Sequence, residues 1–166
     1  ILQKQPTDVG IDIILFDGED WGERTETQGP SLPSTLDFWW CLGSQRWAKN
    51  KHVGGYSAYY GIVLDMVGGK NARFGFEGYS LEYAPSVVDK VWKTAARLGF
   101  TNIFVNEKDG FVIDDHVAVN IHAKIPMIDI ISMGDTHHTR KDNMDNISKE
   151  TLNAVGQTVL QTIYYE

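Results

Sequence analysis

Four short clusters of carboxylate and imidazole side chains are the residues of this chain that could do chemistry. Each lies at the end or the beginning of an apolar run, and they are Glu19-Asp20, Asp65, Asp114-Asp115-His116 and His137-His138. Any one of them alone is typical of a solvated loop, because Asp and Glu are mostly exposed. Together they offer the oxygen and nitrogen donors of a zinc site.

Other motifs that would assign a chemistry are absent from the sequence. No helix-borne His-Glu-x-x-His, phosphate-binding loop, dinucleotide-binding or EF-hand pattern occurs. The single cysteine, Cys41, excludes an internal disulfide and a zinc site built from cysteines. A metal would therefore have to be held by carboxylate and imidazole groups.

The length and the net charge of the chain exclude some classes of function. The 166 residues are enough for one domain with a sizeable core, and we expect residues 1–166 to form a single domain. A formal net charge of -7 without any basic run argues against nucleic acid or an anionic membrane as a partner. The longest apolar runs, 11–16 and 125–131, are far shorter than the roughly 20 residues of a membrane span.

The clusters coincide with the ends of predicted strands. Residues 11–16 are rich in β-branched side chains and predict a largely buried strand that ends at Asp17-Gly18, just before Glu19 and Asp20. Residues 60–67 predict a second buried strand, with Asp65 near its carboxyl end. Residues 21–37 have no periodicity and predict a long surface loop.

The remaining elements alternate between helix and strand. The patterns predict helices at 40–50, at 87–98 behind Pro85 with Gly99 as a stop, and after the capping residue Ser148, and strands at 102–105 and 125–131. Such alternation predicts an α/β layered domain with a mostly parallel sheet. Ligands of such sheets bind beyond the carboxyl ends of the strands, which is where we expect the four clusters to converge.

Five sequence blocks resemble, in order and spacing, the zinc-dependent glutaminyl cyclases of animal and bacterial type, which share the fold of the zinc aminopeptidases. The blocks are Phe16-Asp17-Gly18-Glu19-Asp20, Cys41-Leu42-Gly43-Ser44-Gln45, Val63-Leu64-Asp65-Met66-Val67-Gly68, Ile113-Asp114-Asp115-His116 and His138-Thr139-x-x-Asp142-Asn143. The resemblance runs from about Asp8 to the C-terminus. It implies a three-layer α/β/α sandwich with a mixed, mostly parallel sheet, the phosphorylase/hydrolase-like fold of zinc exopeptidases.

The resemblance also implies roles for individual residues. Asp20 and His138 match zinc ligands, although family members often have Glu where Asp20 stands. Asp is a normal zinc ligand, so the site is preserved by this change. Glu19 matches the general base, and Asp65 and Asp114 match an acidic pair near it, of which one carboxyl should hold a proton.

Several of these residues have a structural alternative. Asp114 could serve as a helix N-cap, and we expect His116 to orient its loop and not to bind metal. His137 stands where animal glutaminyl cyclases have a tryptophan that lines the substrate pocket, so we place His137 and Ile113 in that pocket. Trp21, Trp39 and Trp40 flank the long loop, and of these we assign Trp21 to the pocket wall.

Two reactions share this scaffold. A cyclase would convert the N-terminal Gln of a peptide or protein to pyroglutamate, with one zinc polarising the side-chain carbonyl and Glu19 moving the proton. A two-metal aminopeptidase would use Asp65 as a ligand of a second zinc. Leu64 before Asp65, Asp114 before Asp115-His116, and the long loop after Asp20 favour the cyclase, since the peptidases usually have Asn, Ser and a short connection there.

A third hypothesis is a non-catalytic fragment. The family's third zinc ligand lies on a preceding half of the domain, so the resemblance implies that residues 1–166 are the C-terminal part of a catalytic domain whose N-terminal part is missing. We expect this chain alone to bind zinc weakly, because catalytic zinc sites usually have three protein ligands. Relatives of this kind are commonly exported, which suggests a periplasmic or secreted protein.

Overall fold

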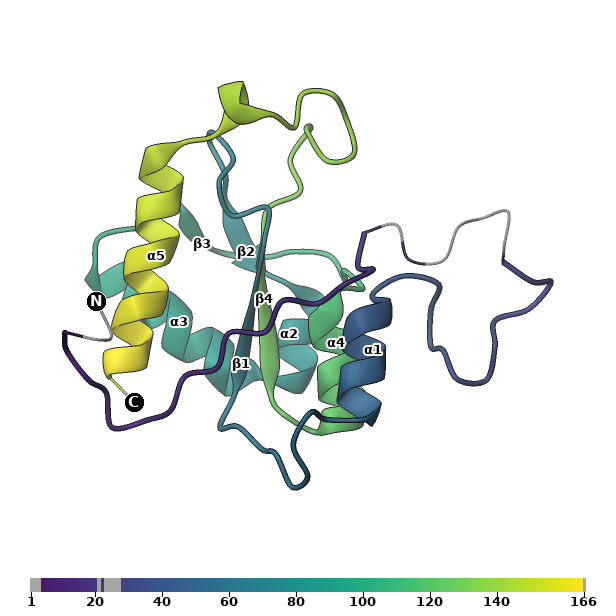
Figure 1. The fold of residues 1–166 in the computed structure, drawn as a ribbon. Coiled ribbons are helices and arrows are strands. Elements are labelled where there is room, and N and C mark those ends of the chain that lie inside the picture. Colours follow the sequence, from purple (N-terminus) through teal and green to yellow (C-terminus); the bar gives the residue numbers. More distant parts are fainter. Residues whose placement is uncertain (1–3, 21, 23–27, 166) are drawn as a thin grey trace.

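Two pairs of parallel strands lie at the centre of the computed structural model, which describes residues 4–20, 22 and 28–165 (Figure 1). β1 (Gly61–Asp65) pairs with β4 (Met127–Ile131), and Asp65 lies opposite Ile131 at their carboxyl ends. β2 (Phe74–Phe76) pairs with β3 (Phe104–Lys108) in an irregular register. Every pairing between these strands is parallel, as the alternation of elements predicted.

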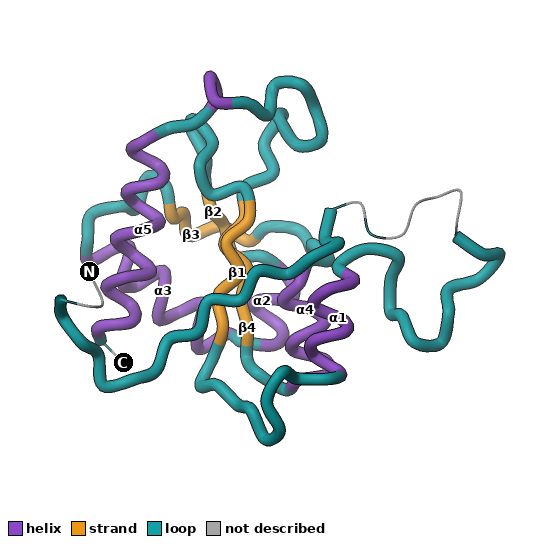
Figure 2. The backbone as a smooth tube through the Cα atoms, viewed as in Figure 1, coloured by secondary structure: helices purple, strands orange, loops and turns teal. Residues whose placement is uncertain are grey.

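Helices cover both sides of the strands. α3 (Pro85–Arg97) and α5 (Lys149–Tyr164) pack together on one side, whereas α1 (Leu42–Lys49), α2 (Gly78–Tyr83) and α4 (Asp115–Ala118) lie on the other (Figures 1 and 2). A π-helical segment, Val119–Ala123, continues α4, and a short 3-10 turn, Met144–Asn146, precedes α5. The predicted layered α/β fold is therefore confirmed.

The main core forms where α3 packs on the strands. Pro85 occupies the first turn of α3, which suits proline because that N–H needs no helical partner. Val87, Val88, Val91 and Trp92 form its buried stripe, and the indole N–H of Trp92 is shared between the carbonyls of Phe74 and Val105, at 3.3 and 3.1 Å. Trp92 thereby connects α3 to both β2 and β3.

The strand predicted at residues 11–16 is wrong. The segment has no regular secondary structure in the part of the chain that is described, and Ile13 and Leu15 are 83% and 90% exposed. β-branched residues favour extended backbone, but only hydrogen bonds to a neighbouring strand make such a segment part of a sheet. None of the strands in the described part of the chain pairs with this segment.

Other elements follow the predictions with small shifts. α1, β1 and β4 lie within the predicted ranges, α3 begins two residues before its predicted range, and β3 spans Phe104–Lys108 instead of residues 102–105. Ser148 caps α5 by accepting a hydrogen bond from the N–H of Thr151 at 3.2 Å. β2 and α2 were not predicted, because elements of three and six residues show too little periodicity. Among the described residues, none of the helices is both long and apolar enough to cross a bilayer.

Candidate active site

Most of the residues singled out in the sequence line one open pocket of about 480 Å³. The pocket wall includes Glu19, Asp20, Asp65, Ile113, Asp114, His137 and His138. It lies at the carboxyl ends of β1 and β4, since Asp65 and Ile131, the last residues of these strands, both line it. The expected convergence of the clusters therefore occurs, while the roles assigned to the side chains stay predictions. Trp21 lies outside the described residues.

The amino end of α1 holds the segment that carries Glu19. The backbone N–H groups of Cys41, Leu42 and Gly43 donate to the carbonyls of Glu19, Gly18 and Asp17, at 3.0, 2.9 and 2.8 Å. The first N–H groups of a helix have no partner within the helix, so they are available for this purpose. A Cβ at Gly43 would lie 2.4 Å from the carbonyl oxygen of Asp17, which explains why glycine stands at this position.

Asp20 and His138 meet in the pocket although 118 residues separate them. The Nε2 atom of His138 and the Oδ1 atom of Asp20 are in hydrogen-bond contact, and both side chains are about half-exposed. The rings of His137 and His138 stack with centroids 3.8 Å apart. A carboxylate oxygen and an imidazole nitrogen that point at the same place are a donor pair suited to zinc, so these two residues fit the metal.

Two other groups of potential metal ligands occur among the described residues, and neither contains Asp20 or His138. The first is Glu19, Cys41 and Asp114. Burial raises the pKa of the Cys41 thiol far above its usual range, and the nearby carboxylates Asp115, Asp114 and Glu19 raise it further. Since zinc binds the thiolate, this group is a poor zinc site. The second group consists of Asp114, His116 and Asp129, which are all buried, and of these Asp114 also lines the pocket.

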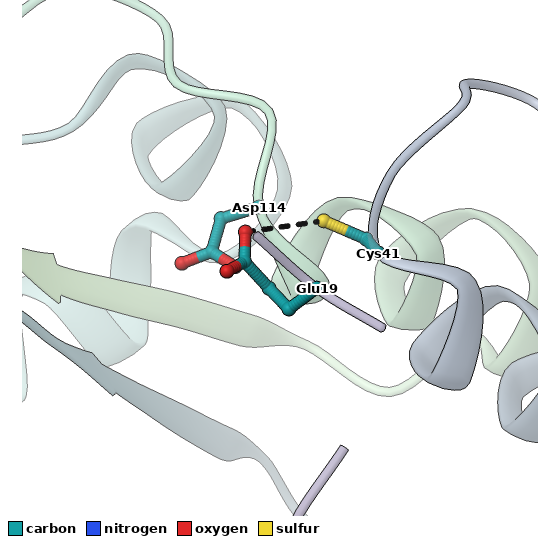
Figure 3. A group of neighbouring side chains, drawn as sticks. All are labelled: Glu19, Cys41 and Asp114. Carbon is teal, nitrogen blue, oxygen red and sulfur yellow. Dashed lines mark hydrogen bonds between the residues drawn. The ribbon is translucent and has the colours of Figure 1, made fainter. Parts of the chain in front are cut away.

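Glu19 has the properties of a group that exchanges protons near neutral pH. Burial raises its pKa to about 7, together with the negative charges of Asp114, Asp65, Asp115 and Asp20. Figure 3 shows its carboxyl group beside that of Asp114, with the Cys41 sulfur on the other side, 3.7 Å from Glu19 Oε1. A carboxyl group with a pKa close to the working pH is an effective general acid and base.

Asp65, Asp114 and Asp115 form the acidic surroundings of Glu19. Burial and the charge of Asp114 raise the pKa of Asp65, and the pKa of Asp115 rises to about 6 through burial and the charges of Asp114 and Asp65, despite hydrogen bonds from Ser44 and Cys41. Asp114 accepts a hydrogen bond from the N–H of Asp115 and caps α4. The capping alternative for Asp114 is therefore correct, and the same residue also lines the pocket.

His116 points to a buried carboxylate that the sequence analysis missed. Its Nε2 atom lies 3.0 Å from Oε2 of Glu77, and both side chains are buried. Burial would raise the pKa of Glu77, but hydrogen bonds from His116, Val112, Ser80 and Tyr79 lower it to about 2. The bond from the Val112 N–H, at 3.0 Å, anchors the loop that leads to Asp114. No local pattern identifies Glu77, because it precedes a helix that was not predicted.

Apolar side chains also line the pocket. They are Trp40, Val112, Ile113, Ile131 and Met133, and Met66 and Asp142 complete the lining. The indole N–H of Trp40 donates to the carbonyl of Ile113 at 3.2 Å, which fixes the ring against this wall. Among the described tryptophans, Trp40 is therefore the one at the pocket. Asp142 belongs to the block that begins at His138, which is the sequence signal that could have identified it.

Comparison with known proteins gives one family and a set of similar structures. The sequence profile of peptidase family M28 matches residues 1–163. A leucine aminopeptidase precursor from Bacteroides thetaiotaomicron VPI-5482 is 48% identical with a TM-score of 0.89, and a glutaminyl cyclase from Bacteroides thetaiotaomicron, bound to N-acetylhistamine, is 47% identical with a TM-score of 0.88. The glutaminyl cyclase of Tannerella forsythia is 43% identical, also with a TM-score of 0.88.

These similarities extend over almost all of this chain but only part of each relative. Each of the three alignments covers 99% of this chain, and they cover 56%, 57% and 58% of the respective relatives. This chain therefore spans a little more than half the length of the structures it matches. None of the curated protein sequences matches it.

Proposed function

Since this chain belongs to peptidase family M28, we propose that its protein is a zinc-dependent glutaminyl-peptide cyclotransferase, and that residues 1–166 form the C-terminal part of its catalytic domain. The reaction would convert the N-terminal glutamine of peptides or proteins to pyroglutamate and release ammonia. The observation that carries the proposal is the position of Glu19, which lies in one pocket with the Asp20–His138 pair and the carboxyl groups of Asp65 and Asp114. Two solved structures similar to this chain are named glutaminyl cyclases.

Asp20 and His138 are the residues of this chain that would hold the zinc. Their donor atoms already meet, and they lie on the solvent-accessible side of the pocket. Bound zinc would supply a Lewis acid that polarises the side-chain carbonyl of the substrate glutamine.

Glu19 would move the proton of the reaction. Its carboxylate would accept a proton from the substrate's α-amino group as that nitrogen attacks the side-chain carbonyl carbon. The new C–N bond closes the five-membered ring, and the C–N bond to the side-chain amide nitrogen breaks. Glu19 would return its proton to that nitrogen, which leaves as ammonia, so the carboxylate is regenerated.

Asp65 and Asp114 would control the charge around Glu19. After burial, the charges of Asp114 and Asp65 raise the pKa of Glu19 most, which supports this role. Two neighbouring carboxyl groups do not easily both ionise, so we propose that one of this pair carries a proton and donates a hydrogen bond within the cluster. The apolar wall around Trp40 and Ile113 would exclude water from the other side of the substrate.

A two-metal aminopeptidase is the second candidate, because one similar structure is named a leucine aminopeptidase precursor. That mechanism needs Asp65 as a ligand of a second zinc. Leu64 before Asp65 and Asp114 before Asp115 favour the cyclase over the peptidase, since the sequence resemblance implies Asn and Ser at these positions in the peptidases.

The experiment that separates the candidates uses the full-length protein. Peptides with N-terminal Gln and aminoacyl chromogenic substrates are incubated with it, and its zinc content is measured in parallel. We expect pyroglutamate and about one zinc per chain, whereas free amino acid and about two zinc ions would establish the peptidase. If neither product forms, the result would support a non-catalytic role.

Neighbouring histidines provide a matched pair of variants for the same assay. We expect H138A to lose most of its zinc, because His138 Nε2 is one of the two donors that meet in the pocket. H137A should keep its zinc, since His137 only stacks on His138. Equal zinc loss in both variants would contradict the ligand assignment.

A further inference from the structure

Asp129 is a buried acid that the proposed reaction does not use. It lies in the middle of β4, its side chain is fully buried, and its backbone N–H donates to Oγ of Ser80 at 2.9 Å. Neither of its two carboxyl oxygens has a hydrogen-bond partner in the structure. A buried charge without a partner is very unfavourable, so this side chain requires an explanation.

The neighbour of Asp129 is a pocket residue. Carboxyl oxygens of Asp129 and Asp114 and a ring nitrogen of His116 lie within 4.8 Å of one another. The Oδ1 atom of Asp114 accepts the N–H of Asp115, whereas Oδ2 is buried without a donor. Asp129 and Asp114 together thus have three oxygens that need a proton donor.

A single proton between the two acids accounts for two of these three oxygens, one as the donor and one as the acceptor. Two carboxylates are both acceptors, so they cannot bind each other unless one of them is protonated. Burial and the charge of Asp114 raise the pKa of Asp129 well above its usual range, and the charges of Asp65 and Glu77 add to this. Of the two acids, Asp129 lies deeper, because Asp114 also lines the open pocket.

We propose that Asp129 is a neutral carboxylic acid in the folded protein and that its O–H group donates a hydrogen bond to Oδ2 of Asp114. With Oδ1 held by the N–H of Asp115, this bond fixes both oxygens of Asp114 beside Glu19. Asp129 is then a positioning residue, since it touches neither substrate nor metal. Its influence on turnover rests on the proposed function, whereas its protonation does not.

Carbon NMR of the full-length protein labelled at the aspartate carboxyl carbon tests the protonation directly. The variant D129N identifies the Asp129 resonance by its loss, and D89N is the control, because Asp89 is an exposed residue paired with Lys93. We expect the Asp129 resonance to show the chemical shift of a protonated acid at pH 7. The shift of a carboxylate at pH 7 would overturn the proposal.

A measurement of metal content tests the alternative that a cation fills the group formed by Asp114, His116 and Asp129. Because a neutral acid binds no metal, wild type and D129N should contain equal amounts of metal per chain. The loss of one metal equivalent in D129N would mean that these residues form a cation site, and the proposal would fail.

Turnover tests the positioning role. Asn at 129 keeps a neutral donor for Asp114 and Ala removes it, so we expect kcat to fall about tenfold in D129A and no more than about threefold in D129N, with similar KM values. An equal fall in both variants would contradict positioning by this proton. If the protein forms no pyroglutamate, the proposed function fails, while the NMR result still decides the protonation of Asp129.

Discussion

Glu19 illustrates how neighbouring residues alter one carboxyl group. Its pKa is raised to about 7 by burial and by four nearby carboxyl groups, which come from segments of the chain up to 96 residues away, as for Asp115. The adjacent Asp20 instead meets His138 at the accessible side of the pocket. Two consecutive acidic residues thus have different surroundings, which agrees with our proposal that one exchanges protons while the other binds metal.

The substitution E19Q tests the proton-transfer role at this scale. Gln has nearly the same shape but cannot accept the proton of the α-amine, so we expect kcat to fall about 100-fold or more while the zinc content is unchanged. The measurement is pyroglutamate formation by the full-length protein, with E82Q on the exposed face of α2 as a control. Activity close to wild type in E19Q would remove Glu19 from this role.

At the scale of elements, two helix starts position the pocket. The first turn of α1 binds the carbonyls of residues 17–19, and the N-cap Glu77 of α2 binds the N–H of Val112 before Asp114. Both contacts hold pocket residues through their backbone atoms, and neither uses the side chain of a residue that would touch the substrate. The pocket therefore depends on the ends of α1 and α2, so changes there should alter activity from a distance.

The substitution G43A tests the contact at α1. The added Cβ would meet backbone atoms of Asp17 at 2.4 and 2.6 Å, so the segment that carries Glu19 has to shift. We expect kcat to fall about tenfold and stability to fall by about 1–3 kcal/mol. The control is G156A in α5, where a Cβ meets nothing within 4 Å and should be neutral or stabilising by up to about 1 kcal/mol. Kinetic constants and urea unfolding of both variants provide the comparison.

The substitution E77Q tests the contact at α2 through the pH dependence of the free energy of unfolding. Hydrogen bonds from His116, Val112, Ser80 and Tyr79 outweigh burial and lower the folded-state pKa of Glu77 to about 2, below its usual 4.5. Ionised Glu77 therefore stabilises the fold above pH 4.5, and this contribution, about 3 kcal/mol, is lost as the pH falls toward 2.

Urea unfolding between pH 2 and pH 5 measures this effect. We expect the free energy of unfolding to fall less steeply with decreasing pH in E77Q than in wild type, because Gln does not titrate. E82Q should behave like wild type. Parallel curves for E77Q and wild type would show that Glu77 is not the group responsible.

At the scale of the whole molecule, the chain covers 56–58% of the three similar structures described above. Two donors, Asp20 and His138, meet at the expected metal position, whereas catalytic zinc sites usually have three protein ligands. Ile13 and Leu15 are apolar and almost fully exposed. These features together agree with our proposal that residues 1–166 act as part of a larger catalytic domain.

A comparison of zinc binding by the isolated 166-residue chain and by the full-length protein tests this proposal. We expect the isolated 166-residue chain to retain little zinc after dialysis and to form no measurable pyroglutamate. The full-length protein should retain zinc and form pyroglutamate. Metal analysis and the peptide assay are run on both proteins. Strong zinc binding and turnover by the isolated chain would show that these residues are sufficient.

The sequence by itself determined the helices α3 and α5, the parallel pairing of strands and, apart from Asp142, the acidic and histidine residues that line the pocket. These features follow from local periodicity, from caps such as Ser148 and from motif order. Only the tertiary structure decided that residues 11–16 have no strand partner among the described residues, that Trp40 lies in the pocket wall, and that Glu77 and Asp129 are buried next to pocket residues. Strand pairing and the burial of a carboxyl group depend on neighbours distant in the chain, and the charges and donors of these neighbours set its protonation.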